Sequence, residues 1–161
     1  MLNVVELQFI DRLRSRLPQH PLLKLGVGDD AAVLTLGDRT DCIVTSDLLA
    51  DGVHFDLQCD ALQHIGRKAL AVNLSDLAAM AAEPIAAVIS LLLPQQGALE
   101  LAERVYDGLL PLAEQFNTAI AGGDTNCWSG KLVINVTAIG RVGPRGVLTR
   151  SGAQPSDAIL V

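Results

Sequence analysis

Apolar residues recur with two different periods along the chain, and the longer period predicts three helices. Helical spacing of apolar positions covers residues 3–17, 61–82 and 98–116. The third pattern contains Gly108 and Pro111, which predict a kink or an early end of that helix.

The shorter period predicts strands between and after the helices. Segments with alternating or continuous apolar residues are bounded by Gly, Asp and Pro turn signals. They occupy residues 31–36, 41–47, 52–56, 84–94, 118–123, 131–142, 146–150 and 157–161. Strands interleaved with long helices predict an α+β fold, in which helices pack on one face of a mixed, mainly antiparallel β-sheet.

Length and composition indicate one globular domain over residues 1–161. Half of the 161 residues are hydrophobic, which is enough for a substantial core. The segment 157–161 is apolar and no turn or cap follows it, so we expect a piece of a longer protein whose second domain is absent here. The alternative is a domain whose last strand ends the fold.

Charge and cysteine usage exclude several functional classes. A net charge of -6 without clustered Lys and Arg argues against nucleic-acid binding. The most apolar stretch, residues 85–93, is far shorter than the roughly 20 residues of a membrane helix, so no membrane partner is expected. Three cysteines far apart, without a CxxC pair, predict neither a zinc site nor a disulfide framework. With no signal-peptide pattern at the N-terminus, a cytoplasmic location is predicted.

Aspartates beside glycines or at the ends of apolar segments are the candidate chemistry. Each alone is more often a turn residue, but a buried carboxylate is costly unless it is paired or bound to a metal, and basic residues nearby are few. Several oxygen ligands together suit Mg²⁺ with phosphate oxygens. The set comprises Asp29, Asp30, Asp47, Asp51, Asp76 and Asp124.

Familiar phosphate-binding loops do not account for this pattern. Residues 26–31, GVGDDA, match the dinucleotide fingerprint, but two acids would repel a pyrophosphate and a strand follows instead of a helix. A Walker-type sequence is absent. The phosphates of a nucleotide are therefore expected to be held through metal ions and by backbone amides of residues 122–124.

Five motifs in this order and spacing resemble the thiamine-monophosphate kinase family. They are GVGDDAAVL, VTSDLLADGVHF, KALAVNLSDLAAMAAEP, AGGDTN and LTRSGAQPSD. The resemblance implies a fold like the N-terminal domain of aminoimidazole ribonucleotide (AIR) synthetase, which belongs to the same ATP-binding superfamily. It further implies transfer of the γ-phosphoryl group of ATP to thiamine monophosphate with several Mg²⁺ ions, in a homodimer formed through the sheet of this domain. The site would lie in a cleft toward a second domain, so this chain alone is expected to have little or no activity.

The resemblance also assigns residues by position. Asp30, Thr45, Ser46, Asp47, Asp76 and Asp124 match metal ligands of the family. Gly123, Asp124 and Arg150 match ATP contacts, and His54 matches a contact of the thiamine substrate. No general base is expected, because a phosphate monoester with a second pKa of about 6 is already largely anionic near neutral pH.

The motif on the predicted helix 61–82 also contains apolar and small residues. Leu70, Leu74 and Leu77 are expected to pack on the sheet, while a stripe of Ala69, Asn73 and Asp76 leaves room for metal and phosphate. Roles for Asp29, Asp51 and Asn73 stay open. His20 and His64 are interpreted as surface residues.

Two alternative functions fit the same sequence. One is another ATP-dependent synthetase of the same superfamily. The other is a non-catalytic dimerisation or metal-binding module, for which Asp30→Ala or Asp124→Ala would not change the binding of Mg²⁺ and an ATP analogue.

Overall fold

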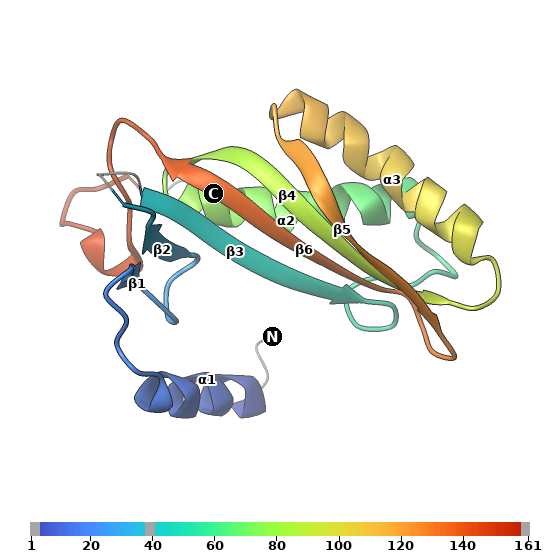
Figure 1. The fold of residues 1–161 in the computed structure, drawn as a ribbon, viewed down its shortest axis with the longest axis horizontal. Coiled ribbons are helices and arrows are strands. Elements are labelled where there is room, and N and C mark those ends of the chain that lie inside the picture. Colours follow the sequence, from blue (N-terminus) through green and yellow to red (C-terminus); the bar gives the residue numbers. More distant parts are fainter. Residues whose placement is uncertain (1–3, 38–40, 159–161) are drawn as a thin grey trace.

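A twisted six-stranded sheet forms the centre of the molecule (Figure 1). The computed structural model describes residues 4–37 and 41–158. Its elements are α1 (Val4–Arg16), β1 (Leu23–Leu25), β2 (Ala32–Thr35), β3 (Asp41–Ala50), α2 (Leu62–Ala79), β4 (Ala82–Pro94), α3 (Ala98–Gln115), β5 (Ala119–Trp128), β6 (Val133–Val142) and a 3₁₀ turn at Arg150–Gly152. The strand order is β1-β2-β3-β6-β4-β5. Only the β4–β5 pair among these strands is parallel, so the predicted mixed, mainly antiparallel α+β fold is confirmed.

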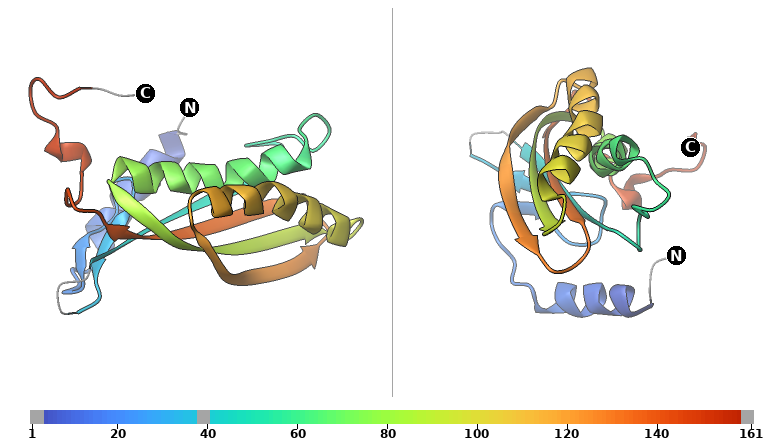
Figure 2. Two further views of the ribbon diagram at one scale, coloured as in Figure 1. Left: turned by 90° about the horizontal axis from the view of Figure 1, so that it is seen from above. Right: turned by 90° about the vertical axis from the view of Figure 1, so that its right-hand side faces the viewer.

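Helices α2 and α3 cover one side of the sheet, which we call the closed face (Figure 2, left). Side chains alternate along a strand, so every second residue of β4 points to these helices. The closed-face residues of the central strands are buried in one core with α2 and α3: Leu49, Ala87, Ile89, Leu91, Leu93, Ile134 and Val136. On α2, Leu70 and Leu77 are fully buried and Leu74 is buried, which confirms the predicted packing stripe.

The other side of the sheet, which we call the open face, has no helix over β4, β5 and β6 in the described residues (Figure 2). It carries the intervening residues of the same strands: Ser46, Leu48, Ser90, Leu92, Val133, Asn135 and Thr137. Leu48 is 58% exposed. One face is thus a packed core and the other a half-exposed mixed surface.

Two glycines allow α2 and α3 to pack backbone against backbone. A Cβ atom on Gly66 would lie 1.9 Å from the carbonyl oxygen of Val105, and one on Gly108 would lie 1.8 Å from that of Gln63. Of the predicted kink or early end at Gly108 and Pro111, the early end is wrong. The helix continues to Gln115 because packing against α2 and the sheet stabilises it, and Gly108 serves this close approach.

Helix α1 lies apart from α2 and α3 (Figures 1 and 2). Its Leu7, Ile10, Asp11 and Arg14 face the segment around residues 26–32 across a cavity. The prediction of a helix before Pro18 is confirmed, although residues 1–3 lie outside the described part of the chain.

Two predicted strands are absent from the described structure. Residues 52–56 form a turn, in which Gly52 has a φ of 82° and the Asp51 carboxylate accepts the N–H of Leu57 at 3.2 Å. This local hydrogen bond closes a loop where the alternation of apolar residues had indicated a strand. Residues 146–150 run without strand pairing into the 3₁₀ turn. The predicted strand 157–161 falls largely outside the described residues.

Strand β5 is longer than predicted and begins one residue later. It extends to Trp128, five residues beyond the predicted end, and lies at the edge of the sheet. Asp124 is consequently inside a strand and not at its end. In the described part of the chain no helix is long and apolar enough to cross a membrane, and the three cysteines are free.

Candidate functional site

Thr45 and Asp76 meet on the closed face, between β3 and the last turns of α2. The Thr45 hydroxyl donates to Oδ2 of Asp76 at 2.7 Å. Thr45 is only 7% exposed, whereas Asp76 remains partly accessible. The alternation of β3 directs Thr45 toward α2, so the two motifs that contain these residues come together across 31 residues of sequence.

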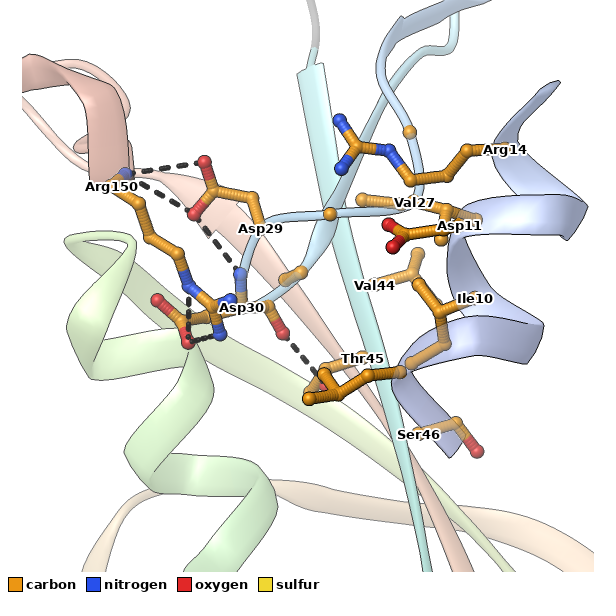
Figure 3. Close-up of a pocket in the computed structure, with 15 residues that line it drawn as sticks. Ile10, Asp11, Arg14, Val27, Asp29, Asp30, Val44, Thr45, Ser46 and Arg150 are labelled. Carbon is orange, nitrogen blue, oxygen red and sulfur yellow. Dashed lines mark hydrogen bonds and ion pairs between the residues drawn. The ribbon is translucent and has the colours of Figure 1, made fainter. Parts of the chain in front are cut away.

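Asp30 joins this pair from the turn before β2 (Figure 3). Its carbonyl oxygen lies 3.3 Å from the Thr45 hydroxyl. Its carboxylate oxygen Oδ1 accepts from Nε of Arg150 at 3.2 Å and also from Nη2. Hydrogen bonding to Asp30 raises the pKa of Arg150, and the charges of Asp30, Asp29 and Asp76 act in the same direction.

Asp47 completes the acidic cluster on the closed face. Burial raises the pKa of Asp47, the negative charge of Asp76 raises it further, and His54 lowers it. Asp47 therefore lies within electrostatic reach of both Asp76 and His54. We call Asp30, Thr45, Asp47 and Asp76 the closed-face cluster.

The closed-face cluster has the donor chemistry for a magnesium ion. Its side chains offer only carboxylate and hydroxyl oxygens, which are the ligands that Mg²⁺ prefers. A cation would also offset the two effects that raise the pKa of Asp47, which are burial first and the negative charge of Asp76 second. Within residues 4–37 and 41–158, however, no three Asp, Glu, His or Cys side chains converge closely enough to form a metal site. The donors fit Mg²⁺, but they are neighbours rather than a closed coordination sphere.

Ser46 belongs to the same motif but points to the open face. Its hydroxyl lies 3.0 Å from that of Thr137 and accepts from Nδ2 of Asn135 at 3.0 Å. The Asn135 amide also donates to the carbonyl oxygen of Asp47 at 3.0 Å. Asn135 and Thr137 were missed by the sequence analysis; polar residues within an otherwise apolar alternation were the available signal.

Asp124 also lies on the open face, far from the closed-face cluster. It pairs with Ser90 in the parallel β4–β5 register and lines a shallow 240 Å³ cavity with Leu48, Asn126 and Asn135 among others. Its carboxylate accepts from the N–H of Thr125 and from Nδ2 of Asn126, both at 2.9 Å. Three strand spacings, roughly 14 Å, separate β5 from β3. Within one chain, Asp124 does not join Asp30, Asp47 and Asp76.

The glycines before Asp124 shape the edge strand. A Cβ on Gly123 would lie 1.7 Å from the carbonyl oxygen of Ile89, so only glycine lets β5 lie against β4 here. Gly122 has a φ of 138°, and the register shifts between Ala87 and Val88. The register skips Ala121, which marks a β-bulge that ends at Gly122, two residues before Asp124.

His54 lies at the tip of the turn after β3, held by backbone contacts. Its Nδ1 accepts the N–H of Ala50 at 3.1 Å, so the neutral ring carries its proton on Nε2. The ammonium group of Lys68 donates to the carbonyl oxygen of His54 at 2.5 Å. Sequence reasoning missed Lys68, although it stands about two helical turns before Asp76 in the same motif.

Asp29, Asp51 and Asn73, to which the sequence assigns no definite role, each form hydrogen bonds in the structure. Asp29 accepts backbone N–H groups, and Asp51 accepts from Leu57 and lies 3.8 Å from the ammonium of Lys131. Asn73 is fully buried and donates to the carbonyl oxygen of Ala69 at 3.1 Å, while its Oδ1 has no partner in the described structure.

The sequence predicts that Ala69, Asn73 and Asp76 leave room beside α2 for metal and phosphate. This prediction is wrong for Ala69 and Asn73. Ala69 and Asn73 are both buried completely, so neither leaves room for metal or phosphate, and only Asp76 stays partly accessible. Both His20 and His64 are exposed, as predicted.

A cavity of about 490 Å³ adjoins the closed-face cluster (Figure 3). Helix α1 contributes Ile10 and Arg14 to its wall, and Asp30, Thr45 and Arg150 form another part. The cavity combines an apolar side with charged groups of both signs.

Comparison with known families identifies the fold. Residues 28–142 match the family model described as AIR synthase related protein, N-terminal domain. The chain therefore belongs to the family of AIR synthase related proteins.

Individual relatives are more specific. A thiamine-monophosphate kinase from Rhodopirellula baltica is 39% identical over 164 residues, covering 98% of this chain and 51% of that protein. One from Bacillus subtilis is 36% identical over 156 residues, covering 97% of this chain and 48% of the relative. The solved structure of AaThiL complexed with AMPPCP and TMP has a TM-score of 0.80 at 29% identity, covering 96% of this chain and 48% of that one. The resemblance to thiamine-monophosphate kinases is thus confirmed, and the chain spans about half the length of these relatives.

Proposed function

We propose that this chain forms the ATP- and Mg²⁺-binding half of an enzyme that phosphorylates thiamine monophosphate to thiamine diphosphate. The observation that carries the proposal is the closed-face cluster, with oxygen donors next to His54 on one side and Arg150 on the other. Similarity to proteins named thiamine-monophosphate kinase, and to a structure complexed with AMPPCP and TMP, supports the choice of substrates.

The reaction does not require a general base from this chain. The acceptor is a phosphate monoester whose second pKa is about 6, so it is already an anionic nucleophile near neutral pH. The difficulty is repulsion between two polyanions, together with their alignment. Mg²⁺, when bound, would neutralise charge on the phosphoryl oxygens.

The chain's own residues would divide the remaining work. Asp30, Thr45, Asp47 and Asp76 would hold the metal ions from the closed face. His54, fixed through Nδ1, would offer its Nε2–H to the thiamine substrate. Arg150 would contact ATP phosphates with a charge-assisted pair of hydrogen bonds.

Ser46 lines the cavity with Asp30 and Thr45, but Gly123 and Asp124 require a second surface in this proposal. They lie on the open face or the edge strand, and Leu48 beside them is 58% exposed. We propose that two copies pair through the open face to form a homodimer, in which Gly123 and Asp124 approach ATP and Ser46 and Asp124 serve as metal ligands. The half-exposed, mixed composition of this face supports an interface between copies.

Binding is tested by calorimetry with Mg²⁺ and AMPPCP. Wild type is expected to bind the analogue only with metal present, and Asp30→Ala and Asp124→Ala each to weaken binding by about tenfold or more. Asp107→Ala, on the exposed side of α3, is the control for loss of one carboxylate. Equal affinity in wild type and both site variants would contradict the proposal and favour a non-catalytic module.

The reaction is tested in the protein that contains this chain. ATP and thiamine monophosphate are expected to give thiamine diphosphate and ADP, both measured by chromatography. Release of ADP with other acceptors but without thiamine diphosphate would favour a different ATP-dependent synthetase of the family.

A further inference from the structure

Arg150 is attached to the Asp29–Asp30 turn at two points (Figure 3). Its backbone N–H lies 3.3 Å from Oδ1 and 3.2 Å from Oδ2 of Asp29. Its guanidinium group donates through Nε and Nη2 to Oδ1 of Asp30. The two acids lie about 120 residues away in sequence, and no strand pairing holds residues 146–150. Before Arg150, Val147 packs against the core and the N–H of Leu148 donates to the carbonyl oxygen of Met80 at 3.2 Å. The contacts with Asp29 and Asp30 attach the segment at Arg150 itself.

The two neighbouring aspartates make different kinds of contact. Oδ1 of Asp29 accepts the N–H of Asp30 at 3.0 Å in addition to the N–H of Arg150. The Asp29 carboxylate is thus directed at backbone donors, whereas the Asp30 carboxylate is paired with a side-chain cation. Asp30 also touches Thr45 through its carbonyl oxygen, which places the guanidinium beside the closed-face cluster.

We propose that Asp29 is a positioning residue that docks the backbone of Arg150, and that the Arg150 guanidinium and a divalent cation are alternative partners of the Asp30 carboxylate. The proposal rests on the proposed function, because it takes Asp30 to be a metal ligand. A metal ion at Asp30 would repel the guanidinium, which has to leave Oδ1. Since Asp29 holds the backbone, the released side chain stays next to the cluster, where it can pair with a phosphate oxygen of the nucleotide.

This exchange predicts that removal of the Arg150 side chain strengthens the binding of Mg²⁺ in the absence of nucleotide. If Arg150 only bound nucleotide, its removal would leave metal binding unchanged in the absence of nucleotide. If it competes for Asp30, Arg150→Gln frees the carboxylate and binds Mg²⁺ more tightly, by roughly 2- to 5-fold for a largely exposed ion pair. The same variant binds AMPPCP with Mg²⁺ more weakly.

The exchange is tested by titrating Mg²⁺ into the chain without nucleotide, by calorimetry. Arg145→Gln is the matched control, because Arg145 is exposed in the same segment and loses the same charge. Arg150→Gln is expected to bind more tightly than both wild type and the control. Equal or weaker binding by Arg150→Gln overturns the exchange.

The Mg²⁺ affinity of Asp30→Asn shows whether a negative result concerns only the exchange or also the proposed function. If Asp30→Asn weakens Mg²⁺ binding but Arg150→Gln does not strengthen it, the metal site stands and the exchange alone is wrong. If Asp30→Asn leaves Mg²⁺ affinity unchanged, Asp30 is not a ligand and both are overturned.

The positioning role of Asp29 is tested by hydrogen exchange at the amides of residues 150–152. Asp29→Ala is expected to accelerate exchange at Arg150, while Asp29→Asn, which loses the same charge but keeps an acceptor oxygen, retains most of the protection. Unchanged exchange in Asp29→Ala, or equal acceleration in both variants, overturns the docking role.

Discussion

The polar side chains of the sequence motifs are divided between the closed and the open face of the sheet, and their contacts differ on the two faces. On the closed face, Thr45 donates a hydrogen bond to Asp76 of α2, and Asp47 lies within electrostatic reach of Asp76. On the open face, Ser46 contacts Asn135 and Thr137, and Asp124 is bound by its own strand. The motif Thr45-Ser46-Asp47 is split between the faces because successive side chains of a strand point in opposite directions.

The acidic side chains of the closed face therefore have few partners among themselves, apart from the hydrogen bond between Thr45 and Asp76 and the contacts of Asp30 with Arg150. Asp76 stands on the packed helix α2, Asp47 stands on β3, and burial together with the negative charge of Asp76 raises the pKa of Asp47. Open-face groups satisfy one another instead. We therefore expect a cation to bind on the closed face, and a second copy of the chain to bind on the open face.

Removing the close approach of α2 and α3 should have the largest effect on the closed face. Alanine in place of glycine usually stabilises a helix by about 1 kcal/mol. Gly108→Ala is expected to do the opposite and to destabilise by about 3 kcal/mol, because its Cβ would lie 1.8 Å from the carbonyl oxygen of Gln63. Denaturant unfolding measures the change; a stabilised Gly108→Ala would show that the helices are not packed this closely.

Leucine truncations compare the two faces with one residue type. Leu70→Ala, in the closed-face core, is expected to lower the free energy of unfolding by about 2–5 kcal/mol. Leu48→Ala, on the open face, should change it by less than about 0.5 kcal/mol when measured at dilutions where the chain is monomeric. A similar loss in both variants would mean that the open face is also covered within the chain.

Substitution of one carboxylate on each face tests which face binds Mg²⁺ in the absence of nucleotide. Asp76→Asn keeps the shape of the side chain and is expected to weaken Mg²⁺ binding by about tenfold, with the fold retained by circular dichroism. Asp124→Asn should have a much smaller effect under the same conditions, since it lies roughly 14 Å from β3. The reverse order, measured by calorimetry, would place the primary metal site on the open face.

Asp47→Asn should have the smallest effect, and its sign follows from the raised pKa. The folded state holds the Asp47 proton to higher pH than the unfolded state, so this group favours folding below its ordinary value of 3.8, and that contribution is lost as the pH rises through the folded pKa. Asparagine mimics the protonated form. Without metal at pH 7, Asp47→Asn is expected to raise Tm by about one or two degrees. Mg²⁺ should then stabilise wild type more than the variant in thermal scans, and a lower Tm of the metal-free variant would contradict the raised pKa.

Much of the fold follows from local periodicity, and its exceptions have local causes. The long helices and the strands at residues 84–94 and 131–142 have strong apolar patterns and are confirmed. The turn at 52–56 has the alternation of a strand, but the carboxylate of Asp51 closes it. The second half of β5 is exposed on both sides, so no apolar pattern indicates it.

The sequence indicates which residues belong to the candidate site, but not how they are placed relative to one another. Asp30, Asp47 and Asp76 are conspicuous because they stand beside or within apolar segments. Their separation from Asp124 depends on β5 pairing in parallel with β4, which is a long-range property of the chain. The contact between Arg150 and Asp29 depends on an irregular segment, for which the sequence has no periodic signal.

Paramagnetic broadening by Mn²⁺ in ¹H–¹⁵N spectra of the chain tests the central claim most directly. With substoichiometric Mn²⁺ and no nucleotide, the amide signals of Asp30, Thr45 and Asp76 should broaden first, while those of Asp124 and Asn126 remain sharp. Broadening that begins at Asp124, or that spreads evenly over both faces, would contradict a cation site on the closed face.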